Sequence, residues 1–114
     1  MTQHANLTTE RWRQFTHPQR VLMIANEMNR ISRLQGPDDS TSRALAYERV
    51  LRLVDLTVAA AERRSVRREL LRWRDLVSVL YLENAARPDA HRAALRALLQ
   101  QTPDSAAQIG YLGC

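Results

Sequence analysis

The chain has 114 residues, of which 45% are hydrophobic and 5% aromatic, so its length suits one ordinary domain and is too short for two. Three glycines and four prolines argue against a many-stranded β protein, because sandwiches and barrels need turn residues about every ten positions. All 17 basic residues are arginine, and with 12 acidic residues they give a net charge of +5, an excess that is typical of nucleic-acid-binding proteins. The composition therefore predicts one all-α domain.

Capping residues mark the first two helices. Thr8 and Glu10 predict a short helix that begins near residue 9, because threonine is a good N-cap and glutamate favours the positive end of the helix dipole. A Thr-x-x-Gln capping box at residues 16–19 predicts a second helix that begins near Pro18. Residues 36–37, Gly-Pro, are expected to end this helix. Its apolar stripe is Val21, Ile24, Met28 and Ile31, widened by Ala25 and Leu34.

Two long helices are expected in the middle of the chain. After the polar loop 38–42, no glycine or proline occurs until Pro88, and one helix over that stretch would be ~65 Å long, far beyond a small domain. We therefore predict a break at residues 62–65, with Ser65 as the cap, and two antiparallel helices of about 21 residues each. The first has an apolar face of Tyr47, Val50, Leu51, Val54, Val58 and Ala61, widened by Leu45, Leu53 and Leu56. The second has Val66, Leu70, Trp73, Val77 and Leu80, widened by Leu71, Leu76, Val79 and Leu82.

The predicted fold is an antiparallel helical bundle of about four helices plus a short N-terminal helix. Pro88 opens the last helix, which is expected to end near Gln101, so residues 1–102 form the domain and residues 103–114 a C-terminal tail. The two central apolar faces are wider than a two-helix contact requires, which favours a bundle with helices crossing at about 20°. Apolar width that the bundle does not bury would be left for a second subunit, so we expect a homo-oligomer.

The composition argues against several classes of protein. The longest apolar runs have about five residues, whereas a membrane-spanning helix needs roughly 20. The polar N-terminal residues show no basic region leading into an apolar one, so no secretory signal and no membrane partner are expected. A single cysteine cannot form an internal disulfide, which makes the cytoplasm the expected location. Three widely separated histidines, no Glu-x-x-His pair and no glycine-rich phosphate loop predict neither a metal nor another cofactor.

A cluster of arginines lies where the second central helix is expected to begin. Positive charge there opposes the helix dipole and costs stability, which favours a site for an anion such as nucleic-acid phosphate, because arginine makes bidentate phosphate contacts. The alternative is a solvated or subunit-bridging face, since acidic residues alternate with the arginines and Arg72 and Asp75 have ion-pair spacing. The cluster consists of Arg63, Arg64, Arg67, Arg68, Arg72 and Arg74.

Charged residues also recur on the first central helix. We expect Glu48, Arg49, Arg52 and Asp55 to form a buried or subunit-bridging ion-pair network that fixes the register of the helices. Glu48 and Arg52 have the spacing of an ion pair within one helix. A carboxylate acid/base pair would be the functional alternative, but no histidine or metal ligand stands at helical spacing to support it. No catalytic residue is therefore predicted here.

The C-terminal tail has the composition of a short docking peptide. Ile109, Tyr111 and Leu112 follow a spacer of small residues and stand among glycines, so the segment is apolar enough to bind a groove and flexible enough to reach it. Cys114 ends the sequence and is expected to be an exposed thiol, with an intermolecular disulfide or a metal contact as alternatives. The alternative to a docking peptide is a tail that folds back onto the bundle or frays.

One further spacing indicates an enzyme. Arg11 and His17 match the R-x4-6-H pattern of the HEPN ribonucleases, small helical proteins in which that pair activates the ribose 2′-hydroxyl. In that family the motif lies on a late helix at a dimer cleft, whereas here it lies near the N-terminus and the histidine precedes a proline. The alternative is a histidine of the capping region with no catalytic role.

Several motifs over residues 8–82 are similar to those of a group of small bacterial and archaeal all-helical proteins. They are Glu10-Arg11-Trp12, Asn26-Glu27 with Arg30, Tyr47-Glu48-Arg49, residues 53–57, residues 68–72 and residues 80–82. This resemblance implies a helical bundle and no particular activity. The leading hypothesis is therefore a non-enzymatic accessory or adaptor protein that acts through protein–protein interaction, with nucleic-acid binding by the arginine cluster as the second hypothesis and a ribonuclease as the third.

Overall fold

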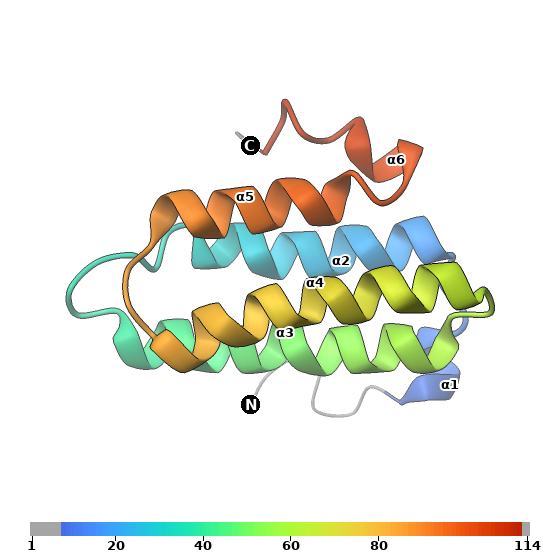
Figure 1. The fold of residues 1–114 in the computed structure, drawn as a ribbon, viewed down its shortest axis with the longest axis horizontal. Helices are drawn as coiled ribbons and strands as arrows, with labels where there is room; N and C mark the ends of the chain where they lie inside the picture. The colour runs from blue at the N-terminus through green and yellow to red at the C-terminus, as the bar shows by residue number, and fades with distance from the viewer. Residues whose placement is uncertain (1–7, 113–114) are drawn as a thin grey trace.

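The computed structural model describes residues 8–112, and every regular element in that range is a helix. The helices are α1 (Thr9–Trp12), α2 (His17–Ile31), α3 (Ser40–Ala60), α4 (Arg64–Glu83), α5 (Pro88–Leu99) and α6 (Pro103–Ala106). Figure 1 shows the four long ones running roughly side by side along the long axis of the molecule. The predicted all-α class is confirmed.

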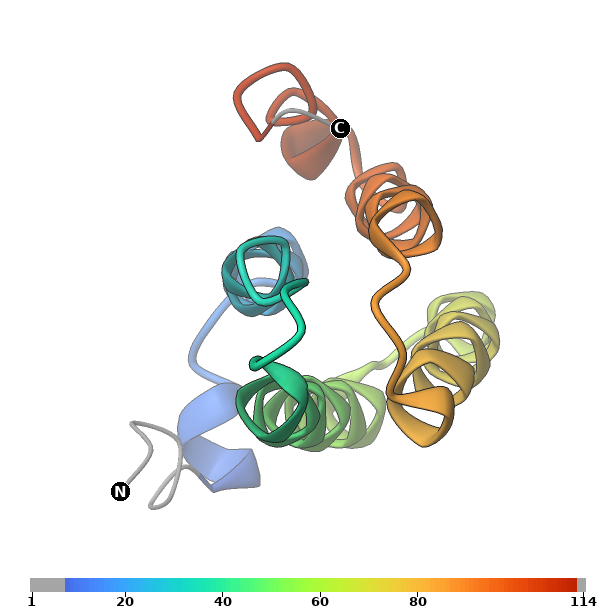
Figure 2. The ribbon, with the colours of Figure 1, turned by 90° about the vertical axis from the view of Figure 1, so that its left-hand side faces the viewer.

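The four long helices form a ring around one core. Each packs against the next in chain order, and the ring closes because α5 packs against α2. Figure 2 looks along the bundle, with the four helices at the corners. The short helix α1 covers the side of α3, and α6 packs on α2 and α5. The bundle of about four helices with a short N-terminal helix is thus confirmed.

The first two helices begin at the predicted caps. The Thr8 hydroxyl accepts a hydrogen bond from the Arg11 amide at the start of α1. The capping box of α2 is complete, because Thr16 Oγ1 accepts from the Gln19 amide and Gln19 Oε1 accepts from the Thr16 amide. These bonds satisfy amide groups that have no partner within their own helix.

The predicted cap between the central helices is wrong. The N-cap of α4 is Arg63, two residues earlier than Ser65, and its side chain makes no capping hydrogen bond. Helix α3 ends at Ala60, and Ala61 has an extended conformation, so the turn is shorter than the segment predicted at residues 62–65.

Two further helix ends differ from the prediction. Helix α2 ends at Ile31, before Gly36, and the Asp39 carboxylate accepts a hydrogen bond from the Gly36 amide in the following turn. A Cβ atom at Gly36 would lie 2.9 Å from that carboxylate oxygen, so an alanine there would require the Asp39 side chain to shift. Helix α5 ends at Leu99, after which the Ser105 hydroxyl donates to the Leu99 carbonyl and fixes the turn into α6.

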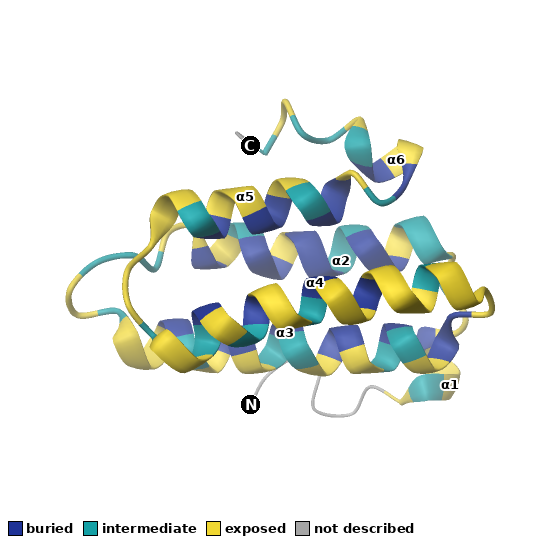
Figure 3. Cartoon of the chain, viewed as in Figure 1, coloured by how far each residue is buried: buried dark blue, intermediate teal, exposed yellow. Residues whose placement is uncertain are grey.

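Buried side chains from all four long helices make up the core. On α2 the predicted stripe is fully buried. On α4 the structure buries four of the five predicted positions and leaves Val66 half-buried. The residues predicted to widen the core face of α4 are exposed instead, as the yellow bands on α4 in Figure 3 show. These exposed residues are Leu71, Leu76, Val79 and Leu82.

Buried hydrogen bonds connect the helices across the core. Trp12 is fully buried, and its indole Nε1 donates to Thr57 Oγ1 at 2.8 Å, which attaches α1 to α3. Arg43 is also buried. Its guanidinium donates to the main-chain carbonyls of Leu34 and Asn84 and to Asn84 Oδ1, so the beginning of α3 is bonded to the segments that end α2 and α4. Asn84 has φ +44° and ends α4 in the left-handed conformation that asparagine tolerates.

A second buried hydrogen-bond chain joins α3, α5 and α2. His91 Nε2 lies 2.7 Å from the Met28 carbonyl oxygen, and His91 Nδ1 lies 2.8 Å from the Tyr47 hydroxyl. A carbonyl only accepts, so Nε2 carries the proton and Nδ1 accepts from the hydroxyl. Burial lowers the pKa of His91 and raises the pKa of Tyr47 to about 12. The pair is therefore held neutral, with the tyrosine as donor.

Candidate functional site

Helix α4 carries four of the large apolar side chains that the bundle leaves exposed. Leu71, Leu76, Val79 and Leu82 are 46, 52, 52 and 77% exposed. Their spacing places Leu71, Val79 and Leu82 away from the buried residues of the helix, and Leu76 at the edge of its buried side, next to Trp73 and Leu80. We call the exposed four residues the α4 outer face. Large side chains of this kind in one row are the usual sign of an interaction surface.

A groove between α4 and α5 continues this surface. Leu76 and Val79 line a hollow of about 360 Å³ together with Ala90 and Ala93 of α5. Leu76 also lines the neighbouring hollow of about 490 Å³, toward Trp73 and Ala97. The alanines of α5 recur at helical spacing, and such small side chains let another helix approach closely. The outer face and the groove therefore form one continuous apolar region.

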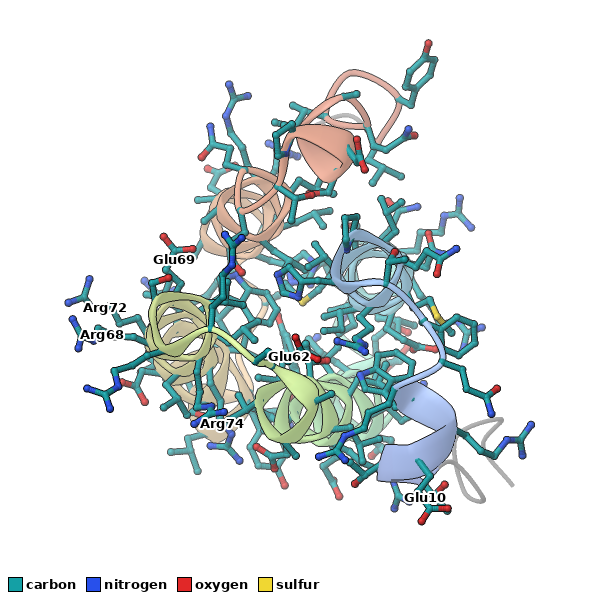
Figure 4. All side chains as sticks on the ribbon, turned by 90° about the vertical axis from the view of Figure 1, so that its right-hand side faces the viewer. Glu10, Glu62, Arg68, Glu69, Arg72 and Arg74 are labelled. Atoms are coloured by element: carbon teal, nitrogen blue, oxygen red, sulfur yellow. The ribbon has the colours of Figure 1, made fainter. Side chains whose placement is uncertain are left out.

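The arginine cluster does not form a single patch. Figure 4 shows Arg68 and Arg72 pointing into solvent, whereas Arg74 lies between α4 and α3. Arg74 Nε donates to an Asp55 carboxylate oxygen at 2.7 Å, and this hydrogen bond raises the pKa of Arg74. The Arg67 guanidinium donates to the Ala61 carbonyl at 2.7 Å and so covers the end of α3.

The remaining arginines of the cluster are exposed. Across residues 8–112 no ion pair joins a carboxylate to Arg63, Arg64, Arg68 or Arg72, and the spacing of Arg72 with Asp75 does not produce one. Four of the six predicted residues are thus accessible to a partner, while two are used within the bundle.

The predicted ion-pair network is divided between two places. Arg49 Nε lies 3.4 Å from a carboxylate oxygen of Glu27, which is almost fully buried on α2 and also lies 3.8 Å from Arg30 Nη1. Asp55 pairs instead with Arg74. Glu48 and Arg52 are exposed on α3. Glu27 was missed as the buried centre, although a charged residue between Ile24 and Met28 on an apolar stripe was a signal for it.

A pocket of about 370 Å³ lies at the end of the bundle where α2 begins, α3 ends and α4 begins; we call it the end pocket. Figure 4 looks onto this end, with Glu62 between the three helices. The polar lining includes His17, Arg20, Glu62 and Arg63, and the apolar lining includes Phe15, Ala60, Ala61 and Val66. Sequence reasoning did not group these residues, because they come from three helices that only the tertiary structure brings together.

Charges in the end pocket are partly desolvated. Arg20 is 8% exposed, and burial lowers its pKa, with Glu62 acting in the opposite direction. Its Nε and Nη2 donate to the Trp12 and Arg13 carbonyls, each at 3.1 Å. Burial also lowers the pKa of His17, and the charge of Arg20 lowers it further, while Glu69 opposes both. Within the described chain, His17 Nδ1 is enclosed without a hydrogen-bond partner.

The other predicted site residues lie apart from this pocket. Arg11 is exposed on α1 and is not among the residues that line the pocket with His17, so the HEPN-like pairing stays a prediction. In the tail, Ile109 and Leu112 pack partly against the core, whereas Tyr111 is exposed. Cys114 lies outside the described residues.

No group of three or more histidine, cysteine, aspartate and glutamate side chains among the described residues could hold a metal ion. None of the described helices combines the length and the apolar character that crossing a membrane requires.

No protein-family model, curated protein or solved structure matches this chain. The similarity of its motifs to small bacterial and archaeal helical proteins therefore stays a prediction. The functional argument rests on the surfaces of the molecule itself.

Proposed function

We propose that this protein is a non-enzymatic accessory protein that acts by protein–protein association through the α4 outer face. The observation that supports this proposal is the row of four large apolar side chains that the bundle leaves exposed on one helix. Covering such a row removes apolar surface from water, which is the main favourable contribution to most protein–protein association. The first partner we propose is a second copy of the chain.

The charges along α4 favour self-association with the two helices antiparallel. The solvent side of α4 carries Arg64, Arg68 and Arg72 in its first half and Glu83 at its end, and the exposed acids Glu69 and Asp75 lie along the same helix. A two-fold axis beside Leu76 would bring Arg68 of each copy level with Glu83 of the other, with the apolar residues, Arg72 and Asp75 between them. Such an isologous contact uses the same patch twice and is the commonest way in which proteins dimerise.

Replacing Val79 by glutamate tests this proposal. The buried charge that Val79→Glu introduces at the centre of the contact should convert the dimer to a monomer, because an unpaired carboxylate is costly to desolvate. The measurement is the molar mass by light scattering across micromolar concentrations. The fold should be kept, since Val79 is half exposed in the monomer.

Leu45→Glu is the matched control, because Leu45 is 51% exposed but lies on α3, away from the α4 outer face. This variant should keep the mass of the unmodified chain. A monomeric mass for the unmodified chain, or equal dissociation by both substitutions, would contradict the proposal.

Nucleic-acid binding is the second candidate function. It is favoured by four exposed arginines near the start of α4, which are Arg63, Arg64, Arg68 and Arg72. Within residues 8–112 none of the four forms an ion pair with a carboxylate. Arginines on such a surface would bind phosphates and release counterions, so affinity should fall as salt rises.

The test is the binding of labelled RNA and DNA at several salt concentrations. Arg68→Gln with Arg72→Gln should weaken binding and reduce the slope of log affinity against log salt by roughly 1–2. Arg33→Gln with Arg92→Gln removes the same charge elsewhere and should have a smaller effect. Affinity that does not depend on salt, or an equal loss in both double variants, would rule this function out.

A further inference from the structure

The end pocket contains a buried positive charge that no carboxylate neutralises by direct contact. The two hydrogen bonds of Arg20 go to main-chain carbonyls, which carry no net charge. In the described part of the chain Arg20 has no ion pair, and Glu62 affects it only through space. A desolvated guanidinium in such a position is stabilised by an anion that reaches it.

Helix α4 begins at the same pocket, and no capping or acidic side chain of its first turn compensates the positive end of its dipole. Its N-cap, Arg63, makes no side-chain capping bond, and its first turn contains no acidic residue. The amide groups of that turn therefore lack the side-chain acceptor that most helices provide. Arginine at this end opposes the helix dipole, and a bound anion would reverse the sign of that interaction.

The negative end of α3, which also meets the pocket, is already neutralised. The Ala59 carbonyl accepts from Arg13 Nη2 at 3.3 Å, and the Ala61 carbonyl accepts from Arg67 Nη2 at 2.7 Å. Two carbonyls at the end of α3 thus accept from arginines, and among the described residues that line the pocket Glu62 is the one carboxylate. The local charge is consequently positive.

We propose that the end pocket binds a small organic anion, with its phosphate or carboxylate group between Arg20, Arg63 and the first turn of α4. Its carbon skeleton would lie against Phe15, Ala60 and Val66, which supply the apolar lining. The volume of about 370 Å³ is in the range of small-molecule sites and is larger than a single inorganic ion needs. This site is independent of the α4 outer face and of the exposed arginines Arg68 and Arg72.

Glu62 and Arg63 should affect the affinity for the anion in opposite directions. The Glu62 carboxylate competes with the ligand for the same positive field, so removing its charge should strengthen binding, whereas a surface charge far from the site should have no specific effect. Arg63 acts in the opposite sense, because its guanidinium is exposed beside the pocket and is available to the anion.

The experiment is a titration of the full chain followed by the backbone amide signals of residues 64–66. Glycerol 3-phosphate and glycerate are the probes, since they differ in the anionic group and share a similar skeleton. One of them should produce a saturable shift with a Kd of about 1 mM or tighter. Glycerol in sodium chloride of matched ionic strength should produce none.

Three variants decide whether the shift reports this site. Arg63→Gln should weaken the better probe about fivefold, and Glu62→Gln should tighten its binding about threefold, since each changes one nearby charge. Arg33→Gln, beyond the far end of α2, should leave the Kd unchanged. Absence of a saturable shift with both probes, or the same loss in Arg33→Gln as in Arg63→Gln, would overturn the proposal.

Discussion

His91 shows how a single polar residue connects the core of this bundle. Its ring donates to Met28 on α2 and accepts from Tyr47 on α3, so one side chain of α5 satisfies polar groups on two other helices. In the neutral ring that burial favours, the proton is on Nε2, because the Met28 carbonyl can only accept. The stability of the bundle should therefore depend on the protonation of this residue.

Stability should fall when the pH is lowered below about 6.5, the ordinary pKa of histidine. Burial lowers the pKa of His91 in the folded chain, so the unfolded chain takes up a proton first and is favoured until the folded pKa is also passed. Urea unfolding at pH 7 and pH 5 measures the effect. His91→Gln should lower stability at pH 7 by about 1–3 kcal/mol through unsatisfied buried groups and should reduce the difference between the two pH values.

His17→Gln is the comparison for this prediction, because burial lowers the pKa of His17 in the same direction. His17 is half-buried and has no hydrogen-bond partner at Nδ1 among the described residues, so its replacement should cost less stability at pH 7. A pH dependence that persists undiminished in His91→Gln would contradict the role assigned to His91.

At the scale of elements, α4 differs from α2 in how it begins. Helix α2 starts with a complete capping box, whereas α4 starts at Arg63 with no capping bond and three arginines in or beside its first turn. The helix is held by its four buried residues, Leu70, Trp73, Val77 and Leu80. Its first turn is thus a place where stability has not been maximised.

Arg63→Asp should stabilise the protein by about 1 kcal/mol, because aspartate caps a helix and favours the positive end of its dipole. Arg63 already has the extended conformation that an N-cap requires, so no change of the main chain is needed. Urea unfolding measures the gain. Arg64→Asp makes the same change in charge one residue later, where the aspartate cannot act as the N-cap, so its gain in stability should be smaller. Equal gains in stability for the two variants would show that charge alone is responsible.

At the scale of the whole molecule, the two proposed binding sites lie at different places on the bundle. The end pocket lies where α2 and α4 begin, and the α4 outer face extends from there toward the opposite end of the bundle. The groove beside α5 joins the apolar side. One helix therefore contributes to both proposed sites, through its first turn to the anion and through its last three turns to a second copy. Association at one site leaves the other accessible.

The sequence by itself determined the helices of this protein, because spacing and capping act within a few residues. The Thr16–Gln19 box, the stripe on α2 and the buried positions of α4 from Leu70 onward were all predictable for that reason. The residue that caps α4 was not, because Arg63 makes no side-chain capping bond and arginine is not a residue that N-caps favour. The expectation that apolar width would exceed what the bundle buries agrees with the exposure of Leu71, Leu76, Val79 and Leu82.

Only the tertiary structure decided which apolar residues neighbouring helices cover. Helical periodicity groups residues on one side of a helix, but it does not say where the next helix packs. For the same reason the buried positions of Arg20 and Arg43 and the convergence of three helix ends on the end pocket could not be predicted. These features depend on contacts between segments far apart in sequence, and both proposed binding sites arise from them.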